Sequence, residues 1–120
     1  AIVNISAWAK KVNLSLDKAA RGITIKLFSS VIMDTRVDTG RMRGNWQSSI
    51  GSPIRKETTA TDKTGTATIN AMQSKAKSGA VNIMTNNVPY AEYWEQQDGM
   101  IAKNMARISR IVKEEVSKTQ

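Results

Sequence analysis

Apolar residues in the first third of the chain recur at steps of three and four, which is the period of an α-helix. This stripe predicts one long helix over residues 5–34, through Ile5, Trp8, Val12, Leu16, Ala19, Ile23, Leu27 and Val31. Asn4 or Ser6 is placed to cap its start, and Gly22 weakens its middle. A second stripe, through Ile101, Met105, Ile108 and Val112, predicts a terminal helix that opens at Met100 with Asp98 as its cap.

Between these helices the pattern alternates, which favours β-strands. Trp46, Ser48 and Ile50 alternate with polar residues and predict a half-buried strand. Thr66, Thr68 and Ile69 predict a returning strand, and residues 80–85 predict a third one. Short helices are expected over residues 70–78 and 90–97, and the polar, Thr-rich residues 52–66 predict an extended arm.

The order of these elements predicts a single α+β domain over residues 1–120. It has a long N-terminal helix, a small antiparallel β-sheet and a C-terminal helix packed on the sheet. The sequence shows no internal repeat and no sign of a second domain.

Composition removes several classes of chemistry. The 120 residues include neither Cys nor His, which excludes disulfides, thiol nucleophiles, Cys/His metal centres and imidazole-based triads. We expect no metal and no cofactor. No apolar run approaches the ~20 residues of a membrane span, so we expect no membrane partner.

The charge is strongly basic. Eighteen Lys and Arg against ten Asp and Glu give a net charge of +8, and such a field attracts polyanions. Around the first turn and strand lie Arg36, Arg41, Arg43, Arg55 and Lys56, with Trp46 nearby. Basic side chains beside a flat aromatic ring are typical of single-strand binding, although Trp46 occupies the position of a core residue. A basic nucleic-acid-binding module is therefore an alternative function, with the first three arginines as candidate DNA-facing residues.

Two patterns raise the question of catalysis. Asp38-Thr39-Gly40 has the turn sequence that carries the catalytic carboxylate of aspartic proteases. Arg41 follows it, however, and a cation there would lower a pKa that must be raised. The pairs Glu92 with Glu95 and Glu114 with Glu115 are the carboxylates available for glycoside hydrolysis, but each belongs to a solvated helix surface. We expect no enzymatic activity.

An aromatic patch follows the predicted third strand. Tyr90, Tyr93 and Trp94 with Met100 form the densest aromatic group of the chain. Core packing and a protein interface both explain such a group, since aromatic residues and Met are enriched at interfaces. Both interpretations stay open at this point.

Two segments of the chain carry motifs that belong together: Val37–Trp46 (VDTGRMRGNW), and Asn87–Glu95 (NVPYAEYWE), which is followed by Gly99-Met100-Ile101. Together these segments resemble the neck or tail-completion proteins, the head–tail joining proteins of tailed bacteriophages. The order of elements is also similar to that family. Trp94 departs from it by standing where an aliphatic residue is usual.

The resemblance implies a structural virion protein located at the neck or tail junction and assembled in the host cytoplasm. It would form a ring of six or twelve copies between portal or head-completion proteins and tail-terminator or tail-tube proteins. Such a ring would line the DNA path, which leaves non-specific contact with genomic DNA open as a further interaction. The family-motif residues are Asp38, Thr39, Gly40, Arg41, Arg43, Trp46, Pro89 and Tyr90, and the candidate subunit-interface residues are Tyr93, Trp94, Arg55 and Lys56.

Overall fold

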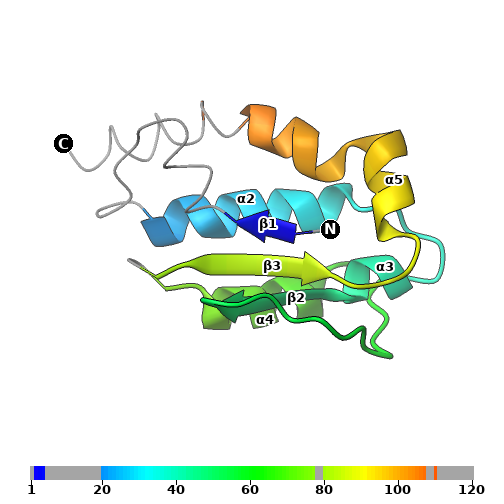
Figure 1. Ribbon diagram of the computed structural model, residues 1–120, viewed down its shortest axis with the longest axis horizontal. Helices are drawn as coiled ribbons and strands as arrows, with labels where there is room; N and C mark the ends of the chain where they lie inside the picture. Colours follow the sequence, from blue (N-terminus) through cyan, green and yellow to red (C-terminus); the bar gives the residue numbers. More distant parts are fainter. Residues whose placement is uncertain (1, 5–19, 78–79, 108–109, 111–120) are drawn as a thin grey trace.

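The computed structural model of the chain describes residues 2–4, 20–77, 80–107 and 110. Its elements are β1 (Ile2–Asn4), α2 (Ala20–Asp34), α3 (Arg41–Gly44), β2 (Trp46–Ile50), α4 (Thr66–Lys75), β3 (Asn82–Asn86) and α5 (Ala91–Asp98). Residues 100–107 are also helical and follow α5 directly (Figure 1). The predicted α+β class and the antiparallel sheet are confirmed.

Three strands form the sheet in the order β1-β3-β2, and both pairings are antiparallel. The central strand β3 is buried along its whole length. Trp46 pairs with Asn86, and Ser48 pairs with Met84. Because paired residues point to the same face, Trp46 and Met84 share the face that joins the hydrophobic core with α2.

α2 supplies the largest part of that core. Ile23, Leu27 and Val31, which belong to the predicted stripe, are fully buried, as are Phe28 and Ile32 beside it. The stripe is therefore wide enough to contact both the sheet and its neighbouring helices. The predicted N-terminal helix is helical from residue 20 onward, and its residues 5–19 lie outside the described residues.

α4 replaces the returning strand that Thr66, Thr68 and Ile69 predict, and that prediction is wrong. Asp62 explains the difference. Its carboxylate accepts hydrogen bonds from the Thr68 N–H at 2.9 Å and the Thr68 hydroxyl at 2.7 Å, and from the Gly65 N–H at 3.0 Å. These bonds satisfy free N–H groups at a helix start, which outweighs the β preference of threonine.

Residues 52–66, the predicted arm, are tied to the body of the domain at several points. The side chains of Gln47 and Asn87 both donate to the Lys56 carbonyl, at 2.6 and 3.3 Å. Asn45 accepts from the Thr58 N–H at 2.7 Å. The segment therefore follows the β2 side of the sheet before α4 begins (Figure 1).

The helical residues 100–107 contact the end of α2. Asn104 donates to the Asp34 carboxylate at 2.8 Å, and Arg107 lies 3.4 Å from the same carboxylate oxygen. In Figure 1 this segment runs on the side of α2 away from β3. Met100 at its start is fully buried in the core.

Candidate functional site

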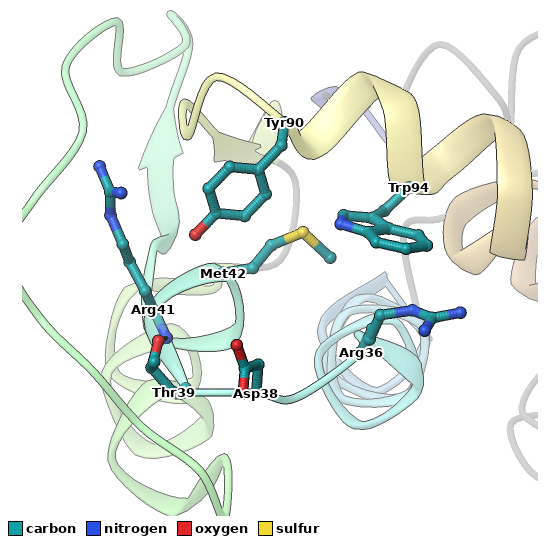
Figure 2. Close-up of a pocket in the computed structure, with 8 residues that line it drawn as sticks. Arg36, Asp38, Thr39, Arg41, Met42, Tyr90 and Trp94 are labelled. Atoms are coloured by element: carbon teal, nitrogen blue, oxygen red, sulfur yellow. Dashed lines mark hydrogen bonds between the residues drawn. The ribbon is translucent and has the colours of Figure 1, made fainter.

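A cleft of about 410 Å³ opens where the segment before and within α3 meets the start of α5 (Figure 2). One wall is the stretch from Arg36 to Met42, and the other carries Tyr90 and Trp94. Figure 2 shows both rings directed down toward Met42, with Asp38 and Thr39 on the loop below. The cleft thus brings together the two segments on which the family resemblance depends, which are about fifty residues apart in the chain.

The turn at Thr39 and Gly40 reverses the chain between α2 and α3. Gly40 has a φ of 88°, in the left-handed region that glycine adopts without strain. Its carbonyl accepts from the Gly44 N–H at 2.8 Å and the Asp62 N–H at 2.9 Å. A Cβ at Gly40 would lie 2.8 Å from the Lys63 nitrogen, and one at Gly44 would be equally crowded by the backbone of residues 60–62. Both glycines therefore let a second backbone segment approach closely.

Arg43 points away from the cleft and clamps the end of α2. Its guanidinium donates to the carbonyls of Ile32 at 3.1 Å, Met33 at 2.8 Å and Thr35 at 3.1 Å, and also to that of Lys63. The last carbonyls of a helix have no partner within the helix, and α2 has no basic residue in its own last turn. Arg43 supplies the missing donors from a neighbouring element.

Arg36 forms one rim of the cleft. Its guanidinium carbon lies 3.9 Å from the centroid of the Trp94 ring, and two of its nitrogens bind the Asp98 carboxylate at 2.9 and 3.0 Å. This bidentate bond lowers the pKa of Asp98 and raises the pKa of Arg36. The predicted role of Asp98 as a helix cap is wrong, because its carboxylate is committed to Arg36.

Glu95 performs the capping that was expected of Asp98. Its two carboxylate oxygens accept from the N–H groups of Ile101 at 2.8 Å and Ala102 at 3.1 Å, at the start of the helical residues 100–107. Glu95 lies within α5, so one side chain links the two helices. A carboxylate used in this way is a structural group, and Glu92 beside it is exposed. Glu114 and Glu115 lie outside the described residues.

Arg41 forms the opposite rim. Its guanidinium carbon lies 5.7 Å from the Tyr90 ring centroid, and one nitrogen binds Glu57 at 2.6 Å. Each rim of the cleft therefore has the same three parts: an arginine, an aromatic ring and a carboxylate from a separate element. Tyr93 lies outside the cleft, 54% exposed, with its ring edge against Trp94 at a centroid distance of 4.8 Å.

Trp46 belongs to the core rather than to the cleft. It is 4% exposed, and its indole N–H donates to the Thr35 hydroxyl at 2.7 Å. Thr35 in turn donates to the Val31 carbonyl at 2.7 Å. Asn86, at the end of β3, donates to the Met42 carbonyl at 2.7 Å and so joins the sheet to the cleft floor.

The remaining predicted site residues are on the surface. Arg55, Lys56 and Pro89 are exposed, and Lys56 takes part in the bonds described above only through its carbonyl. Asp38 is exposed in its turn, at the mouth of the cleft. The sequence gives no sign of the Arg41–Glu57 and Arg36–Asp98 pairs, since the two partners of each pair lie on separate segments of the chain. It also does not point to Asp62 as the cap of α4.

Comparisons with known proteins found no match to this chain. No protein-family model matches the chain, and no curated protein or solved structure matches it significantly. Among the described residues, no helix is long and apolar enough to cross a membrane. Within the same part of the chain, no three acidic side chains group together in a way that would hold a metal ion.

Proposed function

We propose that this chain is a structural virion protein of a tailed bacteriophage, a neck or tail-completion protein that forms a ring in the head–tail connector. In this role it joins portal or head-completion proteins to tail-terminator or tail-tube proteins and surrounds the DNA path. One observation carries the proposal. The two segments that resemble the family pack on each other around one cleft, through Arg36 on Trp94 and Arg41 on Tyr90.

The geometry of these segments gives several of their residues a physical task. Gly40 allows the turn and the close approach of residues 62–63, and Arg43 holds the end of α2. Tyr90 and Trp94 build a wall, and Tyr93 presents an exposed ring beside it. These tasks are structural, and they support a docking role because aromatic side chains such as Tyr93 are enriched at protein interfaces.

Electron microscopy of the purified protein at high concentration tests the proposal directly. We expect closed rings of six or twelve copies. Tyr93→Ala should reduce the ring population, because it removes an exposed aromatic side chain without opening the core. Gln97→Ala, which changes an exposed residue of the same helix, is the matched control. A chain that stays monomeric at every concentration and never associates with phage particles would refute this function.

The nucleic-acid-binding alternative finds less support in the site. Stacking on bases needs exposed aromatic rings, and Trp46 is 4% exposed. The guanidinium of Arg43 is bound to backbone carbonyls, and Arg36 and Arg41 are each paired with a carboxylate. What remains in favour of this alternative is the net charge of +8, together with the exposed side chains of Arg55, Lys56 and Tyr93. Gel shifts with duplex DNA at two salt concentrations separate the functions, since a dedicated binder would bind tightly at the lower one.

A further inference from the structure

Some of the charged side chains around the cleft have ion-pair partners and one does not. Arg36 is bound by Asp98 and Arg41 is bound by Glu57, so both positive rims are already neutralised. Asp38 also lines the cleft, and the structure gives its carboxylate no hydrogen bond and no ion pair among the described residues. The charge left without a partner in the cleft is therefore the negative charge of Asp38, in a chain whose net charge is +8.

The walls of the cleft suit a cation as well. Tyr90 and Trp94 are the ring types that attract ammonium and guanidinium groups most strongly, and each ring already has an arginine beside it, Arg41 and Arg36 respectively. Met42 adds a polarisable thioether at the floor. A volume of about 410 Å³ accepts the head group and part of the aliphatic stem of a long basic side chain. An anionic side chain would meet the free Asp38 carboxylate instead.

We propose that this cleft receives a Lys or Arg side chain from a second copy of the chain, with Asp38 as its counter-ion. The inference rests on the proposed function, because it needs self-association. Eighteen Lys and Arg make a second copy a rich source of such side chains. A cleft on one copy and a projecting side chain on the next are different surfaces, so the contact is head-to-tail, and a head-to-tail contact generates rings when its rotation closes.

The test measures self-association by analytical ultracentrifugation for the wild type and for substitutions of Asp38. Asp38→Asn should weaken association about tenfold, which is the size expected for losing one desolvated ion pair beside aromatic rings. Asp38→Glu keeps the charge and should retain association within about threefold. Glu92→Gln removes the same charge from an exposed position on α5 that does not line the cleft, and it serves as the control.

Charge reversal identifies the incoming side chain. Asp38→Lys should abolish association. Combining it with a second substitution, of the incoming basic residue by Glu, should restore association. The candidates for that residue are exposed: Arg55, Lys56, Lys63, Lys75, Lys77 and Lys103. Thermal melting of each variant separates loss of docking from loss of folding. Because Asp38 is exposed in a turn, the variants at this position should melt at the same temperature as the wild type.

The outcomes separate this inference from the function on which it rests. If the wild type forms rings and Asp38→Asn forms them equally well, the cleft contact is wrong and the ring remains. If Asp38→Asn strengthens association, the occupant is anionic and the inference is overturned. A wild type that never self-associates overturns both.

Discussion

At the scale of single residues, two buried threonines occupy opposite hydrogen-bonding situations. The Thr35 hydroxyl donates to Val31 and accepts the indole N–H of Trp46, whereas the Thr85 hydroxyl is buried without a hydrogen-bond partner. Thr35→Val should lower the free energy of unfolding by about 1–3 kcal/mol, because a buried N–H loses its acceptor. Thr85→Val should raise it by about 1 kcal/mol, since it removes an unpaired hydroxyl from a central strand. Urea denaturation of both variants measures the two changes in the free energy of unfolding. Changes of the same sign would contradict the different hydrogen bonding assigned to the two hydroxyl groups.

Arg43 provides a second prediction at this scale. Its guanidinium reaches several carbonyls at once, and a lysine ammonium lacks the planar fork that such geometry requires. Arg43→Lys should therefore cost about 1–3 kcal/mol of stability although the charge is kept. Arg55→Lys, on an exposed arginine without these bonds, is the control and should change stability little. Denaturant midpoints that match for the two variants would show that the clamp contributes nothing.

At the scale of elements, Asp62 makes the start of α4 sensitive to pH. Partial burial raises the pKa of its carboxyl, but the hydrogen bonds from Thr68, Gly65 and Thr64 outweigh this, and the pKa falls below its ordinary value of 3.8. A carboxyl whose pKa is lower in the folded state stabilises the fold above its unfolded pKa. That stabilisation disappears as the pH falls through the lowered folded pKa.

The corresponding measurement follows unfolding as a function of pH. Asp62→Asn should lower the free energy of unfolding at pH 7 by about 0.5–2 kcal/mol, the range measured for lost helix caps. It should also remove part of the loss of stability that the wild type shows below about pH 4. Asp38→Asn, in an exposed turn, is a matched control. An unchanged acid profile for Asp62→Asn would exclude the carboxylate as the cap.

Local pattern predicts some elements of this chain and fails for others. β2 over Trp46–Ile50 and α5 over Ala91–Asp98 follow from alternation and composition, and β3 lies within two residues of its predicted range. α4 was predicted as a strand followed by a short helix, because its threonines favour strands and its cap, Asp62, lies outside the helix itself. β1 was missed because three residues are too few to show a period.

The sequence predicts the two motifs of the candidate site but not that they lie against each other in one cleft. The sequence shows Asp38–Arg43 and Pro89–Trp94 as separate segments, and nothing local says that Arg36 lies on Trp94. The local sequence pattern also does not predict where the Arg43 side chain points, because its partners depend on where α2 ends relative to α3. Long-range pairing of this kind becomes visible only in the fold.

At the scale of the whole molecule, the close packing of the turn at Gly40 against residues 62–63 depends on glycine. Gly40 and Gly51 have nearly equal φ values, 88° and 84°, but an added Cβ at Gly51 meets nothing within 4 Å, whereas at Gly40 it meets backbone at 2.8 Å. Gly51→Ala should cost about 1–2 kcal/mol for the left-handed conformation alone. Gly40→Ala should cost clearly more, because residues 62–63 must move as well. Thermal unfolding of both variants isolates the close approach, and equal losses would mean that backbone strain is the whole effect.

The net charge gives a prediction whose sign depends on the function. Copies that each carry +8 repel one another, and this repulsion acts over about 30 Å at 0.01 M salt but only about 8 Å at 0.15 M. Ring formation should therefore strengthen across that range, because salt screens this long-range repulsion but screens the docked, partly desolvated Asp38 ion pair much less. Binding to duplex DNA should instead weaken steeply as counterions compete. Light scattering and gel shifts on the same samples measure both trends. Self-association that falls along with DNA binding would mean that nucleic acid holds the copies together, and it would favour the nucleic-acid-binding alternative over a ring built by protein contacts.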